Sequence, residues 1–233
     1  AGIGRSGWAY DQTAVVAHLR TGQPHRESAW QRFLPNGPLA FLPLQDGRVS
    51  LVWSTTPDEA ASLQAASEAE FSERVSIASD HVLGQVTLAG GRAGFPLALW
   101  HARAYVQPRL ALVGDAAHTI HPLAGQGVNL GFLDCASLVQ VLAAASAKGE
   151  ELRGLRVLRR YERWRRSENA VVLGACDTIN RLFAEKSVAL AGLRRFGLSV
   201  VTSQSFLRRA LVERALGVGG DAPQLARRTT ATN

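Results

Sequence analysis

The sequence predicts an α+β protein in which the strands come first and the helices last. The first half holds short runs rich in Val, Thr and aromatic residues, which favour strands. The second half holds long apolar or amphipathic runs with the spacing of helices. A Gly-rich stretch at 114–131 joins the two halves. We therefore expect an antiparallel or mixed sheet, then a strand–loop–helix unit, then C-terminal helices.

Composition is compatible with one large domain or two small ones. Of the 233 residues, 46% are hydrophobic and 19% are charged, so a substantial core is possible. No apolar run approaches the ~18 residues that span a bilayer, and the N-terminus lacks the layout of a signal peptide. The two cysteines, Cys135 and Cys176, belong to no Cys/His cluster, which fits a reducing cytosol. Because the chain contains no Met, we expect a fragment, a processed product or an engineered start.

The net charge of +7 comes from 26 Lys and Arg residues against 19 Asp and Glu residues. Such an excess is typical of proteins that bind nucleic acid or an anionic membrane. Here the basic residues are almost all Arg and lie mostly after residue 150, where solvated helix faces explain them equally well. We expect no nucleic-acid partner.

The predicted strands of the first half are Trp8–Leu19, Ser28–Phe33, Leu39–Leu44, Val49–Thr55, Gly84–Ala89 and Ala93–Trp100. Asp46-Gly47 between two apolar runs is a strong hairpin signal. Pro57, followed by two acidic residues, starts a first helix, and Glu68–Ala78 forms a second.

Residues 2–7 match the pattern G-x-G-x-x-G, but the dinucleotide fingerprint requires a strand before this pattern and a helix after it. Only Ala1 precedes it here, and strand-like residues follow. We interpret residues 2–7 as a flexible entry loop.

The second half is expected to begin with a short buried strand at Leu110–Val113. A helix from Gly127 to about Ala147 is apolar enough to be buried on most sides. Further helices are predicted at 152–168, 170–185 and 188–216, with an unstructured tail from Gly217. The expected domains are 1–107, a β-rich part; 108–150, the junction unit; 151–216, the helical region; and 217–233, the tail.

The junction carries the residues with the clearest chemistry. Gly114 permits a sharp turn at a strand end, and Asp115 then lies where open α/β sheets bind ligands. Gly125 and Gly127 allow another molecule to approach the backbone, and the helix that starts near Val128 presents unpaired N–H groups. The alternative is that Asp115 only caps a turn that the glycines make possible.

The run from Gly114 to Gly131, GDAAHTIHPLAGQGVNLG, resembles the second flavin-contact motif of the class A flavoprotein monooxygenases. The particular residues of this motif are similar to those of the ubiquinone-biosynthesis hydroxylases in this group. The likeness extends over roughly residues 8–185 and is sharp over 109–134. It implies the substrate-domain sheet and part of the flavin-binding domain of the p-hydroxybenzoate-hydroxylase-like FAD/NAD(P)-binding fold.

This resemblance implies roles for individual residues. Asp115 would accept hydrogen bonds from the flavin ribitol, and Pro122 would lie against the isoalloxazine ring. Gly127, Val128 and Asn129 would face the pyrimidine edge of the ring, with Gln126 nearby. The family's Rossmann strand with a true G-x-G-x-x-G is missing from this sequence. We therefore expect this chain alone to bind FAD weakly or not at all.

Other candidate sites are weaker. His118 and His121 form His-x-x-His, but no third ligand lies nearby, so no metal site is expected. No Gly-x-Ser-x-Gly elbow is present, and no catalytic acid or base can be assigned. The side chains of Phe95, Pro96 and Trp53 either line a substrate cavity or belong to the ordinary core of the sheet.

The leading hypothesis is an FAD-dependent monooxygenase that uses NADPH or NADH to hydroxylate a prenylated phenol of ubiquinone biosynthesis. One alternative is a non-catalytic scaffold in a lipid-biosynthetic complex, and another is a hydroxylase of a soluble aromatic. A cytoplasmic location is expected, peripheral on the inner membrane if the arginines at 153–166 or the amphipathic stretch 196–216 bind anionic lipid.

Overall fold

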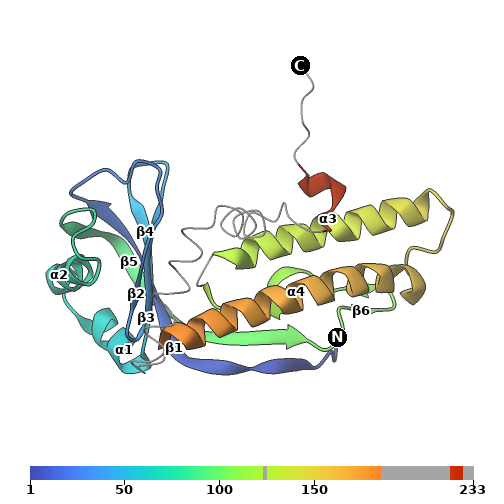
Figure 1. Ribbon diagram of the computed structural model, residues 1–233, viewed down its shortest axis with the longest axis horizontal. Helices are drawn as coiled ribbons and strands as arrows, with labels where there is room; N and C mark the ends of the chain where they lie inside the picture. Colours follow the sequence, from blue (N-terminus) through green and yellow to red (C-terminus); the bar gives the residue numbers. More distant parts are fainter. Residues whose placement is uncertain (123–124, 185–220, 228–233) are drawn as a thin grey trace, which may run out of the picture. The chain divides into compact units, whose positions relative to one another are not determined.

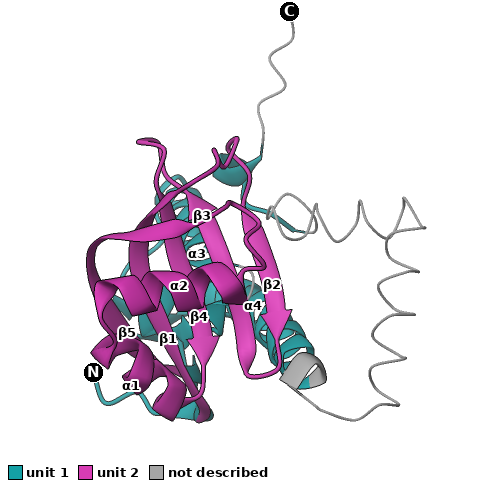
Figure 2. Cartoon of the chain, turned by 90° about the vertical axis from the view of Figure 1, so that its left-hand side faces the viewer, with its two compact units in different colours: residues 1–8, 98–182, 187–233 teal, residues 9–97, 183–186 magenta. Residues whose placement is uncertain are grey.

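The computed structural model describes residues 1–122, 125–184 and 221–227 (Figure 1). Two compact units divide the chain, coloured separately in Figure 2. Unit 2 contains residues 9–97 and 183–186, and unit 1 contains the rest of the chain. The division therefore falls at 8/9 and 97/98, whereas the domain boundary expected from the sequence lies at 107.

The larger sheet is antiparallel at each pairing whose register is resolved. Its strand order is β2-β3-β4-β1-β5-β8, formed by β1 (Arg5–Thr21), β2 (Trp30–Leu34), β3 (Gly37–Pro43), β4 (Val49–Thr55), β5 (Val86–Ala102) and β8 (His118–Thr119). The predicted hairpin between β3 and β4 is confirmed, because Gly47 adopts a φ of 83° and Asp46 accepts a hydrogen bond from the Arg48 amide. The expected α+β class, with an antiparallel sheet followed by helices, is therefore confirmed.

Unit 2 is built around a core between its strands and two helices. Helices α1 (Pro57–Ala65) and α2 (Glu68–Ala78) lie over the same face of the sheet (Figure 2). Leu63 and Phe71 from these helices are fully buried with Leu39 and Leu51 from the strands. Both helices begin where expected, at a capping Thr or Ser side chain.

Unit 1 contains the short strands β6 (Val106–Gln107) and β7 (Leu110–Ala111), the 3-10 turn η1 (Gly114–Ala116) and the long helices α3 (Gln126–Ser146) and α4 (Leu155–Ala184). Helices α3 and α4 run side by side (Figure 1) and share a core with the strand region. Tyr105 and Tyr161 are its largest fully buried side chains.

Two predicted boundaries are absent. The strands expected at 84–89 and 93–100 are one strand, β5, which continues through Gly91 and through Gly90 at a φ of 137°, a backbone conformation that favours glycine. The helices expected at 152–168 and 170–185 are one helix, α4, because no Gly or Pro lies between them to end it.

Two expectations about burial are wrong. The strand at 110 has two residues and is half-buried, since it pairs only with β6. Helix α3 exposes Val128, Phe132 and Val139, each by more than half, so it is not buried on most sides. Among the described helices, Gly127–Ser146 alone is long and apolar enough to cross a membrane, by length and mean hydropathy. The expectation that no apolar run approaches this length is therefore wrong.

The two ends of the chain also differ from expectation. Residues 5–7 are not a loop but the start of β1, and Gly7 approaches the Leu99 carbonyl so closely that any Cβ would collide with it. The predicted helix 188–216 lies outside the described residues. In the expected tail, Gln224–Ala226 form a 3-10 turn, and the Gln224 amide donates to the Gln140 side chain on α3 at 2.8 Å.

Candidate functional site

The candidate site begins with an exposed carboxylate on a tight turn in unit 1. Gly114 has a φ of 56°, which only glycine adopts readily, and its carbonyl accepts a hydrogen bond from the Ala117 amide at 2.8 Å. Asp115 is thereby placed on the outside of the turn. Within the described ranges, no side chain or amide hydrogen-bonds or ion-pairs with its carboxylate, which leaves that group available to a ligand.

The second part of the site is the N-terminus of α3. Gly125 precedes the helix with a φ of 61°, no side chain caps the first turn, and no acidic residue lies in that turn. Val128 is 68% exposed, and Asn129 is exposed as well. The first N–H groups of α3 and the positive end of its dipole are therefore open to an electron-rich group.

The turn and the helix are in direct contact. Gly114 packs against Gly131, where a Cβ would meet the Gly114 Cα at 3.4 Å. Gly127 faces the Ile120 side chain at ordinary contact distance. Pro122 is half-buried, and Gln126 contributes the first backbone residue of the helix. The structure thus brings together the predicted flavin-contact residues at the start of α3 and those at η1.

Sequence reasoning missed the buried polar residues beneath this turn. Asp134 on α3 is fully buried and bonds to Gly114, His118, Arg165 and Asn169. In the sequence, Asp134 is a single acid in an apolar helix, and its partners lie on a different turn and a different helix. The one available signal was that an acid in such a run must be paired or removed from the core.

The charge state of this buried carboxylate is set by its donors. Burial of Asp134 opposes its ionisation, but hydrogen bonds from His118, Arg165 and Asn169 outweigh that effect and keep its pKa below the ordinary value. Because an ionised carboxylate only accepts, His118 must carry its proton on Nε2.

The second histidine of the junction has a different environment. His121 is 1% exposed, and burial lowers its pKa to about 4, with the charge of Asp177 acting in the opposite direction. His121 is therefore neutral at physiological pH. No group of three metal-ligating side chains occurs among the described residues.

The predicted substrate residues are not gathered into one site. Trp53 is 7% exposed and belongs to the core of unit 2, as the ordinary sheet-core interpretation implies. Phe95 is 56% exposed on β5, and Pro96 next to it is also exposed. Strand β1 lies between the strands that carry Trp53 and Phe95.

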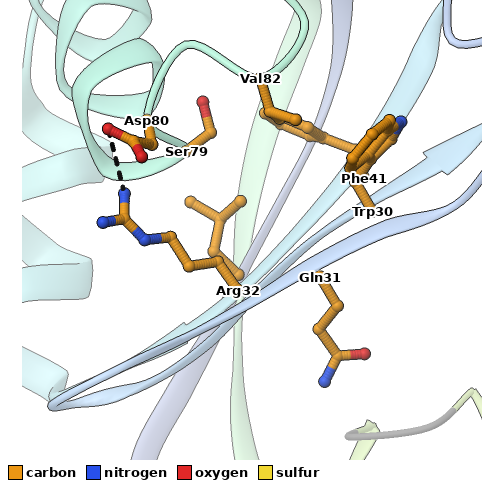
Figure 3. A pocket seen from close by; sticks show the side chains of 8 residues that line it. Trp30, Gln31, Arg32, Phe41, Ser79, Asp80 and Val82 are labelled. Carbon is orange, nitrogen blue, oxygen red and sulfur yellow. Dashed lines mark ion pairs between the residues drawn. The ribbon is translucent and has the colours of Figure 1, made fainter. Parts of the chain in front are cut away.

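A pocket of about 340 Å³ in unit 2 contains none of these three residues. Figure 3 shows its lining, which includes Trp30 and Phe41 from the sheet and Val82 after α2. Arg32 and Asp80 form an ion pair at its rim, with a distance of 4.0 Å between their nearest atoms. The pocket lies at the β2 edge of the sheet, so it gives no support to a substrate site at Phe95.

The residues present fit one side of a flavin. An exposed carboxylate suits ribitol hydroxyls, and an uncapped helix N-terminus suits the electron-rich pyrimidine edge. Open space beside Gly125 leaves room for a ring to approach the backbone. A Gly-rich strand–turn–helix for the pyrophosphate is not found in the parts of the chain that the structure describes.

Comparison with known proteins agrees with this chemistry. The family model described as FAD binding domain matches residues 8–173. The 3-demethoxyubiquinol 3-hydroxylase of Escherichia coli is 41% identical over 94% of this chain and 56% of its own length. The mitochondrial ubiquinone biosynthesis monooxygenase COQ6 of Mus musculus is 41% identical over 91% of this chain and 52% of its own length.

A solved structure shows the same fold. The p-nitrophenol 4-monooxygenase PnpA of Pseudomonas putida matches with a TM-score of 0.73 and 20% identity, over 94% of this chain and 55% of the other. The chain thus spans about half the length of the curated relatives and of the structure that it matches.

Proposed function

The chain belongs to the FAD-binding domain family, and we propose that it forms part of an FAD-dependent monooxygenase that hydroxylates a prenylated aromatic precursor of ubiquinone. One structural observation carries the proposal. The exposed Asp115 carboxylate and the uncapped N-terminus of α3 lie on elements that are in direct contact. The relatives named above, two of which are ubiquinone-biosynthesis enzymes, support the substrate class.

The proposed roles are those that the resemblance to the flavin-contact motif implies, and the exposure of Asp115 and of the start of α3 supports them. Asp115 accepts hydrogen bonds from the ribitol hydroxyls and so fixes the position of the cofactor. The backbone N–H groups of residues 127–129 hold the pyrimidine edge, and Pro122 limits the space beside the ring. The positive end of the α3 dipole stabilises negative charge at that edge. When bound, FAD would take two electrons from NADPH or NADH and activate O2, so that one oxygen atom goes to the substrate and the other to water.

The test uses the full-length protein that carries this chain. The protein is incubated with FAD, NADPH or NADH, and a short-chain prenylated phenol under isotopically labelled oxygen gas. We expect a hydroxylated product that contains one labelled oxygen atom. Labelled product from an unprenylated phenol at an equal rate would favour a hydroxylase of a soluble aromatic. A protein that binds no flavin would contradict the proposal and favour the scaffold hypothesis.

We further propose that the protein is cytoplasmic and binds peripherally to the inner membrane. Exposed arginines on α4 recur at the spacing of one helical face, namely Arg156, Arg159, Arg163 and Arg166. Each basic residue near an anionic surface contributes about 1 kcal/mol. The arginines in the stretch 196–216 lie outside the described residues, so the proposal rests on α4.

This membrane proposal is tested by flotation with phosphatidylglycerol-containing vesicles. We expect binding at low salt that decreases as salt is added, and that decreases further when Arg156, Arg159 and Arg163 are replaced by Gln. A matched variant, Arg26→Gln, changes an exposed arginine of unit 2 and should bind normally. Absence of flotation at low salt would contradict peripheral binding.

A further inference from the structure

One carboxylate oxygen of Asp134 accepts hydrogen bonds from both ends of the turn that carries Asp115. Asp134 Oδ2 accepts a hydrogen bond from the Gly114 amide at 3.0 Å and one from His118 Nε2 at 2.7 Å. Gly114 starts the turn, and His118 follows it as the first residue of β8. The residues between these two anchors include Asp115, whose side chain is exposed.

The second oxygen of Asp134 is held from α4. Arg165 Nε donates to Oδ1 at 2.8 Å, and Asn169 Nδ2 donates to the same atom at 3.0 Å. Arg165 Nη2 also donates to Asn169 Oδ1 at 2.7 Å, which fixes the two donors relative to each other. Both carboxylate oxygens are therefore bound, each by two donors, which restricts rotation of the group.

The connections extend from Asn169 through two more residues. Asn169 also donates to the Tyr105 hydroxyl at 3.2 Å, and that hydroxyl lies 2.9 Å from His101 Nε2. Asp134, Asn169 and Tyr105 are fully buried, and Arg165 is 3% exposed. The ionisable groups that interact with Asp134 are thus His118 beside η1, Arg165 and Tyr161 on α4, and Tyr105 before β6.

Packing alone does not require this arrangement. A buried ion pair is seldom more stabilising than apolar residues of similar volume, since both charges lose their hydration. What an apolar residue at 134 would lack is an acceptor for the Gly114 amide. That amide is one peptide unit from Asp115, so its direction, together with the left-handed conformation of Gly114, constrains the backbone that carries the Asp115 side chain.

We propose that Asp134 is a positioning residue for the cofactor: it orients the Gly114–Asp115 turn so that the Asp115 carboxylate is presented to the ribitol. This proposal rests on the proposed function of the site. The contact between Gly114 and Gly131 on the same helix supports it, because Gly131 lies about one turn before Asp134. The turn is therefore attached to one face of α3 at two points.

The experiment is a double-mutant cycle on FAD affinity in the full-length apoprotein. We compare wild type, Asp115→Ala, Asp134→Asn and the double variant by quenching of FAD fluorescence. The Asp134→Asn variant should raise the Kd about tenfold or more, as expected when a hydrogen bond to a charged group is lost. In the Asp115→Ala background the same change should raise the Kd by less than about threefold, because the group that Asp134 positions is gone.

A purely structural role predicts a different result. Asp134→Asn would then lower the melting temperature of the apoprotein, while the Kd of the folded protein would stay unchanged or would change equally in both backgrounds. Either outcome overturns the positioning role. A wild-type protein that binds no FAD would instead contradict the proposed function, so the two failures are distinguishable.

A second variant covers the case in which Asp134→Asn does not fold. His118→Phe keeps a ring of similar shape but has no donor, so it removes one anchor of the turn and leaves Asp134 with its other three donors. It should raise the Kd in the wild-type background and not in the Asp115→Ala background. The matched control is Glu150→Gln, which removes the ion pair with Arg160 elsewhere in unit 1 and should leave the Kd unchanged. Equal effects of His118→Phe in both backgrounds would contradict the proposal.

Discussion

Asp115 and Asp134 are two aspartates of the same unit whose environments give them opposite tasks. Asp115 is exposed and offers its charge to a ligand, whereas Asp134 is buried and uses its charge to hold the protein. Residue type alone does not distinguish them. Their surroundings do, because four donors converge on Asp134 and none of the described residues binds Asp115.

Replacement of Asp115 by Ala should weaken FAD binding without loss of fold. A hydrogen bond to a charged acceptor contributes ~1.5–3 kcal/mol, which corresponds to about a 10- to 150-fold rise in Kd. The melting temperature should not change, because the side chain is exposed and supports no described contact. A matched variant, Asp58→Ala on α1, should retain wild-type affinity. Unchanged affinity in Asp115→Ala would remove the ribitol role.

His121 should make the protein less stable in mild acid. Its pKa is about 4 in the folded state and about 6.5 in an unfolded chain. Between these values the unfolded chain binds a proton that the folded protein does not. The free energy of unfolding therefore falls as the pH drops from about 6.5 to about 4, by up to roughly 3 kcal/mol. Urea unfolding of wild type and His121→Leu across this range tests the prediction, and equal pH slopes would contradict it.

At the scale of elements, the bounds of a helix or strand can be predicted from the sequence where the residues that fix them are close together in the chain. The helix at Glu68–Ala78 and the strand at Val49–Thr55 have the bounds that the sequence predicts, and in the structure the Ser67 cap and the Asp-Gly turn fix them within a few residues. The junction turn was also placed correctly. The network beneath it was not, since Asp134 and Arg165 meet only after α3 and α4 pack.

The cap of α2 gives a prediction at this scale. The Ser67 side chain accepts a hydrogen bond from the Glu70 amide at 3.2 Å. Ser67→Ala should lower the free energy of unfolding by about 1 kcal/mol, because one N–H group of the first turn loses its acceptor. Ser67→Asp retains an acceptor and should stay close to wild type. Urea denaturation measures both, and equal losses in the two variants would contradict the capping role.

The core between α2 and the sheet gives a larger effect. Phe71 is fully buried, and its replacement by Ala should cost about 3–5 kcal/mol through lost burial and the cavity left behind. On the same helix, Ile77 is 59% exposed, and Ile77→Ala should change the stability by only about 0.5 kcal/mol. Similar losses from the two variants would show that the helix packs differently.

At the scale of the whole molecule, the described residues supply contacts for one end of a long cofactor. In the proposed function, the turn at Asp115 and the start of α3 would contact the ribitol and the ring, and the described elements include no Gly-rich strand–turn–helix for the pyrophosphate. We expect the 233-residue chain, purified alone, to fold and to bind FAD far more weakly than the full-length protein does. Absorbance between ~350 and ~500 nm, followed by FAD titration, measures this. A yellow chain with stoichiometric, tightly bound flavin would contradict the expectation.

The anchoring of one turn by Asp134 also limits how this fold can be recombined. A chimera that moves α3 of this chain into another protein carries Asp134 along without the arginine and asparagine of α4 that donate hydrogen bonds to it, unless α4 is transferred too. If only the turn were exchanged, Asp134 would face a new turn whose backbone amide points in another direction and does not donate to it. The turn at Gly114, the helix with Asp134 and the helix with Arg165 therefore form the smallest set of segments that a designer can transplant together.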